Sequence, residues 1–414
     1  MVGRFRAAVR VSALPLAILL AIVPVVGLST RSVAGAAVVQ LQSQPYTWKN
    51  AVINGGGFIT GIVFHPSVQN LAYARTDIGG LYRWNQAAGR WVPLLDWINW
   101  DNWGYSGVWS VALDPNNGNT VYAAVGMYTN GWDPNNGAVL KSTDQGNTWT
   151  INPLPFKGAG NMAGRGCGER LAVDPNNSSI LYLAATGDQA TTYGLWKSTS
   201  GGTSWSQVTS FPAVGDWVEV PGDFFNYNNT YQGLWWVQFD KRFVTSGVTQ
   251  NIYVGVATKN GPTVYRSTNG GASFTATGAT GLPTTEAADF HAVPGREGDI
   301  WLAGGATGSA YGLWHSTDSG STFTKLSNVS LADAVGFGMA ATGQTYPALY
   351  IQGTVSTIRG YYRSTDAGAT WVRINDDAHQ WYACGTKSVT GDPRIYGRVY
   401  ISTNGRGIIY GDPQ

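Results

Sequence analysis

One carboxylate in this sequence has a setting that chemistry could use. Asp77 follows the apolar stretch "LAYART" and is followed directly by Ile78 and the pair Gly79 and Gly80. A short strand that ends in a carboxylate and two glycines predicts a turn, in which Asp77 either bonds the backbone of the turn or is presented at a surface. Arg75 lies two residues earlier, so its charge would favour the ionised carboxylate, and it is also a candidate substrate contact.

Three stretches carry a high density of aromatic residues. They are "DWINWDNWGYSGVW" (96–109), "GMYTNGWDPNNG" (126–137) and "VEVPGDFFNYNNTYQGLWW" (218–236). Exposed aromatic surface usually has a partner, and flat rings flanked by Asn, Asp and Gln suit the C–H faces and hydroxyls of sugars. The candidate sugar-binding residues are Trp97, Trp100, Trp103, Tyr105, Tyr128 and Trp132, whereas Trp109, Trp235 and Trp236 enter strand-like runs and are expected to be structural.

A carboxylate beside sugar-binding rings is a candidate general base for glycoside hydrolysis, with Asp77 as the base. The alternative is that Asp77 only organises its turn and that many of the rings pack between sheets.

These side chains must be positioned by an array of short strands. One motif recurs as "KSTDQGNTW" from Lys141, "KSTSGGTSW" from Lys197, "RSTNGGASF" from Arg266, "HSTDSGSTF" from His315 and "RSTDAGATW" from Arg363, with weaker copies from Tyr82 and Ile401. A repeat of roughly 40–50 residues is typical of propellers. Each copy resembles the Asp-box hairpin, in which Ser and Asp bond backbone N–H groups and a glycine provides positive φ.

The repeats predict an all-β fold, a single β-propeller of seven four-stranded blades. The expected blade starts are Phe58, Val108, Arg170, Leu234, Phe290, Phe337 and Tyr382. An incomplete ring or a piece of a larger assembly is the alternative.

The ends and the composition limit the classes of function. Residues 1–36 have three early arginines, an apolar run and "VAGA", which is typical of a cleaved signal peptide and predicts a secreted, extracellular protein without a membrane span. A short linker (37–45) would precede the propeller (46–414). Without the signal peptide the net charge is about −2, so nothing indicates nucleic-acid binding. We expect a monomer without cofactors. A metal is not expected because His65, His291, His315 and His379 are scattered. Cys167 and Cys384 either pair or remain free thiols.

Several long motifs resemble glycoside hydrolase family seventy-four, the xyloglucanases and related endoglucanases. "YARTDIGGLYRW", "GYSGVWSVALDPNN", "GMYTNGWDPNNGAVLKSTDQGNTW" and "GRGCGERLAVDPNN" resemble the first propeller of these proteins, up to about residue 270. "AVPGREGDIWLAGG" and "YGRVYISTNGRGIIYGDP" resemble the very end of their second propeller, so residues 271–414 correspond to that part. The resemblance implies an inverting hydrolase of xyloglucan or a related β-1,4-glucan, with Asp77 as its general base.

The sequence departs from the family in its length. Family members have two tandem propellers, with the general acid on the second, and no stretch of this chain matches the acid-bearing segment. The remaining loop carboxylates are Asp216, Asp223, Glu286, Asp289, Asp376 and Asp377. Activity is therefore expected to be impaired, and a non-catalytic propeller that binds plant polysaccharide is the alternative. A sialidase-like hydrolase ranks below both, because the arginine cluster with a Tyr/Glu pair is not found.

Overall fold

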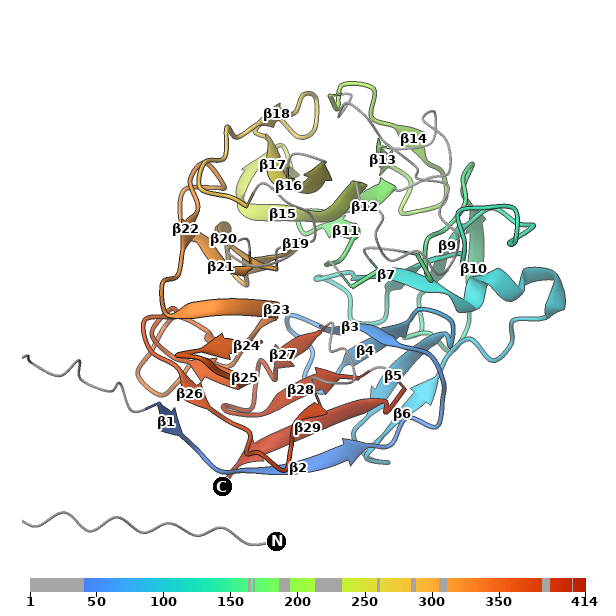
Figure 1. Ribbon diagram of the computed structural model, residues 1–414. Helices are drawn as coiled ribbons and strands as arrows, with labels where there is room; N and C mark the ends of the chain where they lie inside the picture. Colours follow the sequence, from blue (N-terminus) through green and yellow to red (C-terminus); the bar gives the residue numbers. More distant parts are fainter. Residues whose placement is uncertain are drawn as a thin grey trace, which may run out of the picture. The chain divides into compact units, whose positions relative to one another are not determined.

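The computed structural model describes residues 41–162, 165–166, 168–185, 194–212, 233–258, 261–283, 288–304, 311–381, 388–403 and 405–414. Their strands form seven antiparallel sheets arranged as blades around a centre (Figure 1). Five blades have four strands in consecutive order, with the first strand innermost, whereas blade six gains β1 as a fifth strand and blade seven takes β2 as its fourth. The predicted all-β, seven-bladed propeller is therefore confirmed.

The first four blades are formed by β3 to β18, taken four at a time in chain order. Blade one contains β3 (Ile59–Phe64), β4 (Ala72–Thr76), β5 (Leu81–Asn85) and β6 (Arg90–Pro93). Blade two contains β7 (Val108–Leu113), β8 (Val121–Val125), β9 (Ala138–Ser142) and β10 (Thr150–Pro153). Blade three contains β11 (Leu171–Asp174), β12 (Asn177–Ala185), β13 (Gly194–Ser198) and β14 (Ser206–Gln207). Blade four contains β15 (Gly233–Thr245), β16 (Val248–Thr258), β17 (Gly261–Ser267) and β18 (Thr275–Ala276).

The last three blades close the ring. Blade five contains β19 (Ala288–Val293), β20 (Arg296–Gly304), β21 (Gly312–Ser316) and β22 (Thr324–Lys325). Blade six contains β23 (Val329–Gly338), β24 (Ala348–Val355), β25 (Ile358–Ser364) and β26 (Val372–Arg373). Blade seven contains β27 (Val389–Gly391), β28 (Val399–Ser402) and β29 (Ile408–Pro413), and its outermost strand is β2 (Tyr46–Ala51) from the other end of the chain.

Strand β2 is paired with β29 along its full length. Tyr46 lies opposite Pro413 and Ala51 lies opposite Ile408. Just before it, β1 (Gln42–Ser43) pairs in parallel with β26 of blade six. The segment expected to be a linker thus includes a strand, while the expected signal peptide lies outside the described residues. No helix among the described residues is long and apolar enough to cross a membrane.

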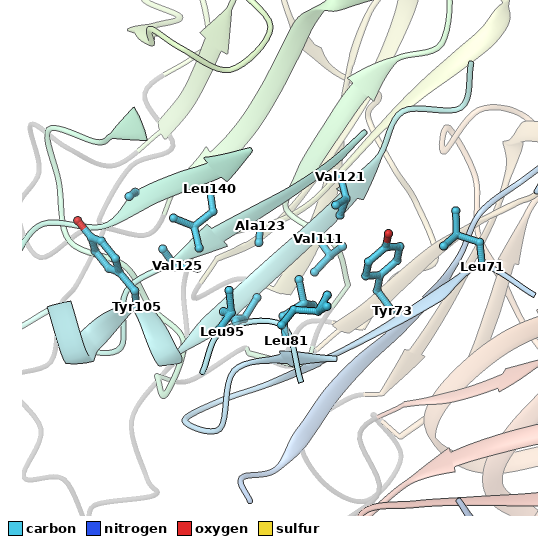
Figure 2. Packing of buried hydrophobic residues seen from close by; sticks show 13 residues of the cluster. Leu71, Tyr73, Leu81, Leu95, Tyr105, Val111, Val121, Ala123, Val125 and Leu140 are labelled. Carbon is cyan, nitrogen blue, oxygen red and sulfur yellow. The ribbon is translucent and has the colours of Figure 1, made fainter. Parts of the chain in front are cut away.

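Buried side chains fill the seam between each pair of adjacent blades. One cluster combines Leu71, Tyr73 and Leu81 of blade one with Val111, Ala123 and Leu140 of blade two (Figure 2). Six further clusters occupy the other seams, including one that joins Ala51, Tyr400 and Ile408 of blade seven to Ile59 and Tyr82 of blade one. Each fully buried large apolar side chain contributes roughly 1.5–3 kcal/mol, so the seams are the main source of stability.

The Asp-box copies have the predicted turn chemistry. In all five clear copies the serine Oγ accepts a hydrogen bond from the glycine N–H four residues later, at 2.7–3.0 Å. These turns join the third and fourth strands, and the closing aromatics, such as Trp149 and Phe274, pack into the seams.

Two sequence predictions about the repeat were wrong. The copy from Ile401 joins the second and third strands of its blade, where the Thr403 hydroxyl donates to Gly407 O at 2.8 Å, and is therefore not an Asp-box. The inner strand of blade six begins at Val329 and Phe337 lies near its end, so the expected start near Phe337 was too late in the chain. The starts near Phe58, Val108, Arg170, Leu234 and Phe290 agree with the structure, whereas Tyr382 lies outside the described residues.

Candidate functional site

The alternation of strand direction places Asp77 and the aromatic stretches at one end of the ring. Turns between second and third strands share this end with the connections that lead from one blade to the next, while the Asp-boxes lie at the other end. Asp77 lies in the β4–β5 turn, residues 94–107 connect blades one and two, and residues 126–137 form the β8–β9 turn. The three segments therefore meet at a common rim, which we call the site end.

The turn that carries Asp77 needs both of its glycines. The Thr76 hydroxyl donates to Gly80 O at 2.9 Å and accepts from Gly79 N at 2.7 Å, which closes the turn. A Cβ on Gly79 would lie 1.9 Å from the carbonyl oxygen of Gly56, and Gly80 has a φ of +87°. Gly80 N also donates to Ser106 O at 2.7 Å, so the turn is fixed to the aromatic connection beside it.

The two carboxylate oxygens of Asp77 have different surroundings. Oδ1 accepts a hydrogen bond from Phe58 N at 2.7 Å, and the Asp77 N–H donates to Phe58 O at 3.1 Å. Oδ2 lies 3.5 Å from Nε of Arg165. The residue is 6% exposed. Asp77 is thus both a turn organiser, through Oδ1, and a carboxylate whose second oxygen faces a cation.

Arg165 is the cation that sequence reasoning missed. Its guanidinium lies 5.7 Å from the centre of the Phe58 ring, and its side chain is 32% exposed. It occurs in the motif "GRGCGERLAVDPNN", but it is 88 positions after Asp77 and only the ring topology brings the two together. A basic residue in a glycine-rich connection was the only signal available.

Arg75 does not have the role that the sequence suggested. It is 1% exposed, and its Nε donates to Oε1 of Glu169 at 2.7 Å. Its other N–H groups donate to the Thr60 hydroxyl and to the carbonyls of Arg165 and Gly168. The guanidinium therefore joins blade one to the connection before blade three instead of facing a substrate.

Glu169 completes this buried pair. Its Oε2 accepts from the Ser110 hydroxyl and from Val111 N, both at 2.7 Å, and its backbone carbonyl accepts from Val237 N at 3.1 Å. Because β7 and β15 are innermost strands, Glu169 binds their free inner edges and links blades two and four. Both carboxylate oxygens are used in structure.

The aromatic residues divide into an exposed set and a buried set. Trp100 is 84% exposed, Trp132 is 75% exposed and Trp97 is 44% exposed. Trp103 and Tyr128 are half-buried and form a row of rings with Trp132, with centroid distances of 6.2 Å from Trp103 to Tyr128 and 6.5 Å from Tyr128 to Trp132. These five residues form what we call the aromatic platform.

One short helix contains residues of both sets. Residues Trp100–Ser106 form the 3₁₀ helix η1, which has a kink at Asn102 between Trp100 and Trp103. Tyr105 is 6% exposed, within the cluster between blades one and two (Figure 2). Tyr105 is thus a core residue, not a sugar contact. Trp109 and Trp236 are buried, as predicted, and the side chain of Trp235 lies outside the described residues.

Asp133 organises the β8–β9 turn of the platform. Its carboxylate accepts from Met127 N at 3.2 Å and from Asn135 N at 3.1 Å, and it is 1% exposed. A Cβ on Gly104 would lie 1.9 Å from this carboxylate, so the glycine allows η1 to pack directly on the β8–β9 turn. The two aromatic stretches are therefore one surface.

The other candidate carboxylates give no open partner for Asp77 in the described part of the chain. Asp289, on the innermost strand of blade five, is buried and lies 2.8 Å from Nε2 of His291. Burial disfavours the charged imidazole, but the carboxylates of Asp289 and Glu169 raise the pKa of His291 above its ordinary value. Asp376 and Asp377 form surface pairs with His379 and Arg373. Asp216, Asp223 and Glu286 lie outside the described residues, as do Cys167 and Cys384.

The histidines and acidic residues show no metal centre within the described ranges. His65 is buried in the β3–β4 turn, where Nδ1 accepts from Val68 N at 3.0 Å. His315 stacks on Trp301 at 3.9 Å and contacts Asp299 at 2.6 Å. Each histidine thus has a local partner that accounts for its position.

This combination defines a class: an Asp-box β-propeller with a carboxylate and an aromatic platform at one end. No family model matches the sequence. A xyloglucanase of Hypocrea jecorina is 42% identical over 344 residues, which is 80% of this chain and 40% of that protein. The crystal structure of the GH74 xyloglucanase from Xanthomonas campestris matches with a TM-score of 0.70 and 32% identity, over 88% of this chain and 53% of that chain. In sequence and in structure the chain is thus similar to the xyloglucanases of this glycoside hydrolase family, GH74.

The chain spans only about half the length of that solved relative. A xyloglucanase of Paenibacillus sp. is 28% identical over 740 aligned residues, covering 90% of this chain and 71% of that protein. Because the chain has only 414 residues, that alignment includes a long stretch of the relative without a counterpart here. The chain is therefore a shortened form of the relatives that it matches.

Proposed function

We propose that this protein is a secreted glycoside hydrolase that acts on xyloglucan or a related β-1,4-glucan. Xyloglucanase relatives support the substrate class, because they match 80–90% of the chain. The observation that carries the proposal is the position of Asp77 Oδ2. It faces a cation at the same end of the ring as the exposed rings of Trp100 and Trp132.

Asp77 is the proposed general base of an inverting reaction. Oδ1 is held by the Phe58 N–H, so Oδ2 is the oxygen left to take a proton from the attacking water. Inversion places this water on the face of the sugar ring opposite the leaving group, and the carboxyl groups of base and acid lie about 6.5–9.5 Å apart. The aromatic platform would hold the neighbouring sugar residues by their C–H faces.

The proposed activity is slow, because the general acid of the family has no matching segment here. Among the described carboxylates, Glu169 uses both oxygens in structure and Asp289 is buried against His291. Positioned acid catalysis contributes typically about 10²–10⁴ in rate, and that factor would be missing.

The second candidate function is a non-catalytic module that binds the same polysaccharide. The same two engaged carboxylates favour it, since a platform without a proton donor can bind without cleaving. In this case Asp77 would remain only as the organiser of its turn.

The experiment measures reducing ends released from xyloglucan and, separately, binding of xyloglucan by affinity electrophoresis. The variants are Asp77→Asn, which retains the Oδ1 acceptor for Phe58 N, and Asp96→Asn, an exposed carboxylate in the neighbouring connection, as the matched control. A hydrolase loses its turnover in Asp77→Asn and keeps it in Asp96→Asn. Binding without turnover in the unaltered chain would reject catalysis and favour the binding module.

A further inference from the structure

Asparagine followed by glycine is a pair of residues that can react with itself. The glycine nitrogen can reach the side-chain carbon of the asparagine, because glycine has no side chain to obstruct the approach. The sequence contains seven such pairs, which begin at Asn54, Asn117, Asn130, Asn136, Asn260, Asn269 and Asn404. Asn260 and Asn404 lie outside the described residues, so five pairs can be compared.

Two of these pairs are held at the asparagine side chain. Oδ1 of Asn117 accepts from the backbone N–H two residues later at 3.1 Å, and Oδ1 of Asn130 accepts in the same way at 3.0 Å. This hydrogen bond closes a small turn and fixes the rotation of the side chain. The side-chain carbon can turn towards the following glycine nitrogen only if the bond is broken first.

Two further pairs are held at the glycine. After Asn136, the buried Gly137 N donates to Phe156 O at 2.8 Å. After Asn269, the glycine N–H donates at 3.1 Å to a carbonyl of β16, and Oδ1 of Asn269 accepts from Ser273 N at 3.0 Å within an Asp-box. A backbone N–H that is engaged with a carbonyl must lose that bond before its nitrogen can attack a side chain.

Asn54 has neither restraint. It is exposed, and its side chain and the Gly55 N–H make no hydrogen bond within the described part of the chain. Asn54 lies in the irregular segment between β2 and β3, with a φ of +41°, and is followed by Gly55, Gly56 and Gly57. Three successive glycines allow the backbone angles that bring the Gly55 nitrogen to the side chain of Asn54.

We propose that Asn54 is a site of spontaneous deamidation. The Gly55 nitrogen attacks Cγ of Asn54 and a C–N bond forms, while Nδ2 leaves as ammonia with the proton of the Gly55 N–H. Water then opens the resulting cyclic imide at one of its two carbonyls. The products are aspartate and isoaspartate, and in isoaspartate the main chain passes through the former side chain. Water is the only co-reactant.

The position of Asn54 gives this modification a consequence for the candidate site. Phe58 N, four residues later, donates to Asp77 Oδ1 at 2.7 Å. Gly57 lies against the same oxygen, since a Cβ on Gly57 would be 3.1 Å from it. Isoaspartate lengthens the main chain by one methylene and adds a negative charge to this segment. The hydrogen bond that holds Asp77 therefore weakens in the modified chain, whether Asp77 is a base or only organises its turn.

The test incubates the unaltered chain at mildly alkaline pH and takes samples over time. The samples are digested at acid pH, where little further ammonia is lost, and the peptides are analysed by mass spectrometry with electron-transfer fragmentation, which distinguishes isoaspartate from aspartate. We expect the peptide that contains Asn54 to gain one mass unit about 10-fold faster than those with Asn136 or Asn269, since roughly one hydrogen bond must first break at these internal controls. Equal rates at the three positions, or no gain at Asn54, would overturn the proposal.

A variant that cannot lose ammonia at this position completes the test. Asn54→Gly removes the amide and tolerates the positive φ, whereas a side chain at Gly55 would place its Cβ 1.9 Å from the Tyr82 hydroxyl oxygen. The Phe58 amide resonance is followed by NMR in chains labelled at the phenylalanine nitrogens. We expect it to shift in proportion to the isoaspartate formed in the unaltered chain and to stay fixed in Asn54→Gly. An unmoved resonance in the modified chain would refute the link to Asp77, and this readout needs no turnover.

Discussion

Replacing Arg75 by methionine decides between its two possible roles. The structure makes Arg75 a buried link, whereas its position two residues before Asp77 suggested a substrate contact. Arg75→Met keeps the aliphatic stem but removes the partner of Glu169 and the donors to the Arg165 and Gly168 carbonyls. We therefore expect a loss of stability, with any effect on glycan binding following from the loss of structure.

The magnitude follows from the burial of the pair. Breaking one partner of a buried ion pair costs about 3–5 kcal/mol. The Arg75 side chain is 1% exposed but that of Glu169 is 25% exposed, and a carboxylate that can be partly hydrated places the cost at the lower end, about 3 kcal/mol. For a ring of this size, with an unfolding entropy of about 2.1 cal/mol/K per residue, this lowers the Tm by roughly 4 °C.

The assay is equilibrium unfolding in guanidinium chloride followed by tryptophan fluorescence, together with thermal unfolding. Arg398→Met is the matched control, because Arg398 also binds a carboxylate, Asp412, at 2.7 Å but both side chains are partly exposed, at 24% and 31%. We expect that control to lose about 1 kcal/mol or less. The reasoning is refuted if Arg75→Met unfolds like Arg398→Met and nevertheless fails to bind xyloglucan.

Three further predictions concern other parts of the ring. Hydrogen bonds from the Thr148 hydroxyl and N–H lower the pKa of Asp144 from 3.8 to about 2. The stability that this shift contributes is present above about pH 4 and is lost as the pH falls towards 2. Asp144→Asn should therefore flatten the acid part of the stability–pH curve measured by urea unfolding. Trp100→Ala and Trp132→Ala should weaken xyloglucan binding in affinity electrophoresis while the free energy of unfolding stays within about 0.5 kcal/mol, because both rings are largely exposed; a large loss of stability would contradict the platform. Deleting residues up to Ala51 removes β2 and should abolish cooperative unfolding in calorimetry, and a two-state transition in the shortened chain would show that closure is dispensable.

The blades could be predicted because their signal is local. In the five clear copies of the Asp-box a serine bonds the N–H of the glycine four residues later, and the seven copies read from the sequence, two of them weak, predicted the number of blades. The same local logic failed at Ile401, where similar letters occupy a turn between different strands. Sequence similarity identified a turn there, but the place of that turn in the blade depends on pairing with β2.

The site was only partly predictable, because its side chains meet through the ring. Asp77 and the exposed tryptophans were found from their residue types, while Arg165 and Glu169 were not, since their partners lie about ninety positions away. Tyr105 was misassigned because spacing in a loop does not show which face of η1 turns inward. Long-range charge pairs and the faces of short helices thus need coordinates.

The pairing of β2 with β29 has a consequence for changes in chain length. The sheet that completes the circle combines β2, near the start of the described chain, with β27, β28 and β29, its last three strands. Gaining or losing whole repeats in the interior of the chain changes the number of blades but leaves β2 and β29, the strands that close the ring, in place. Such a fold can tolerate recombination between its repeats far better than trimming at either terminus, and a relative of half the usual length can still close.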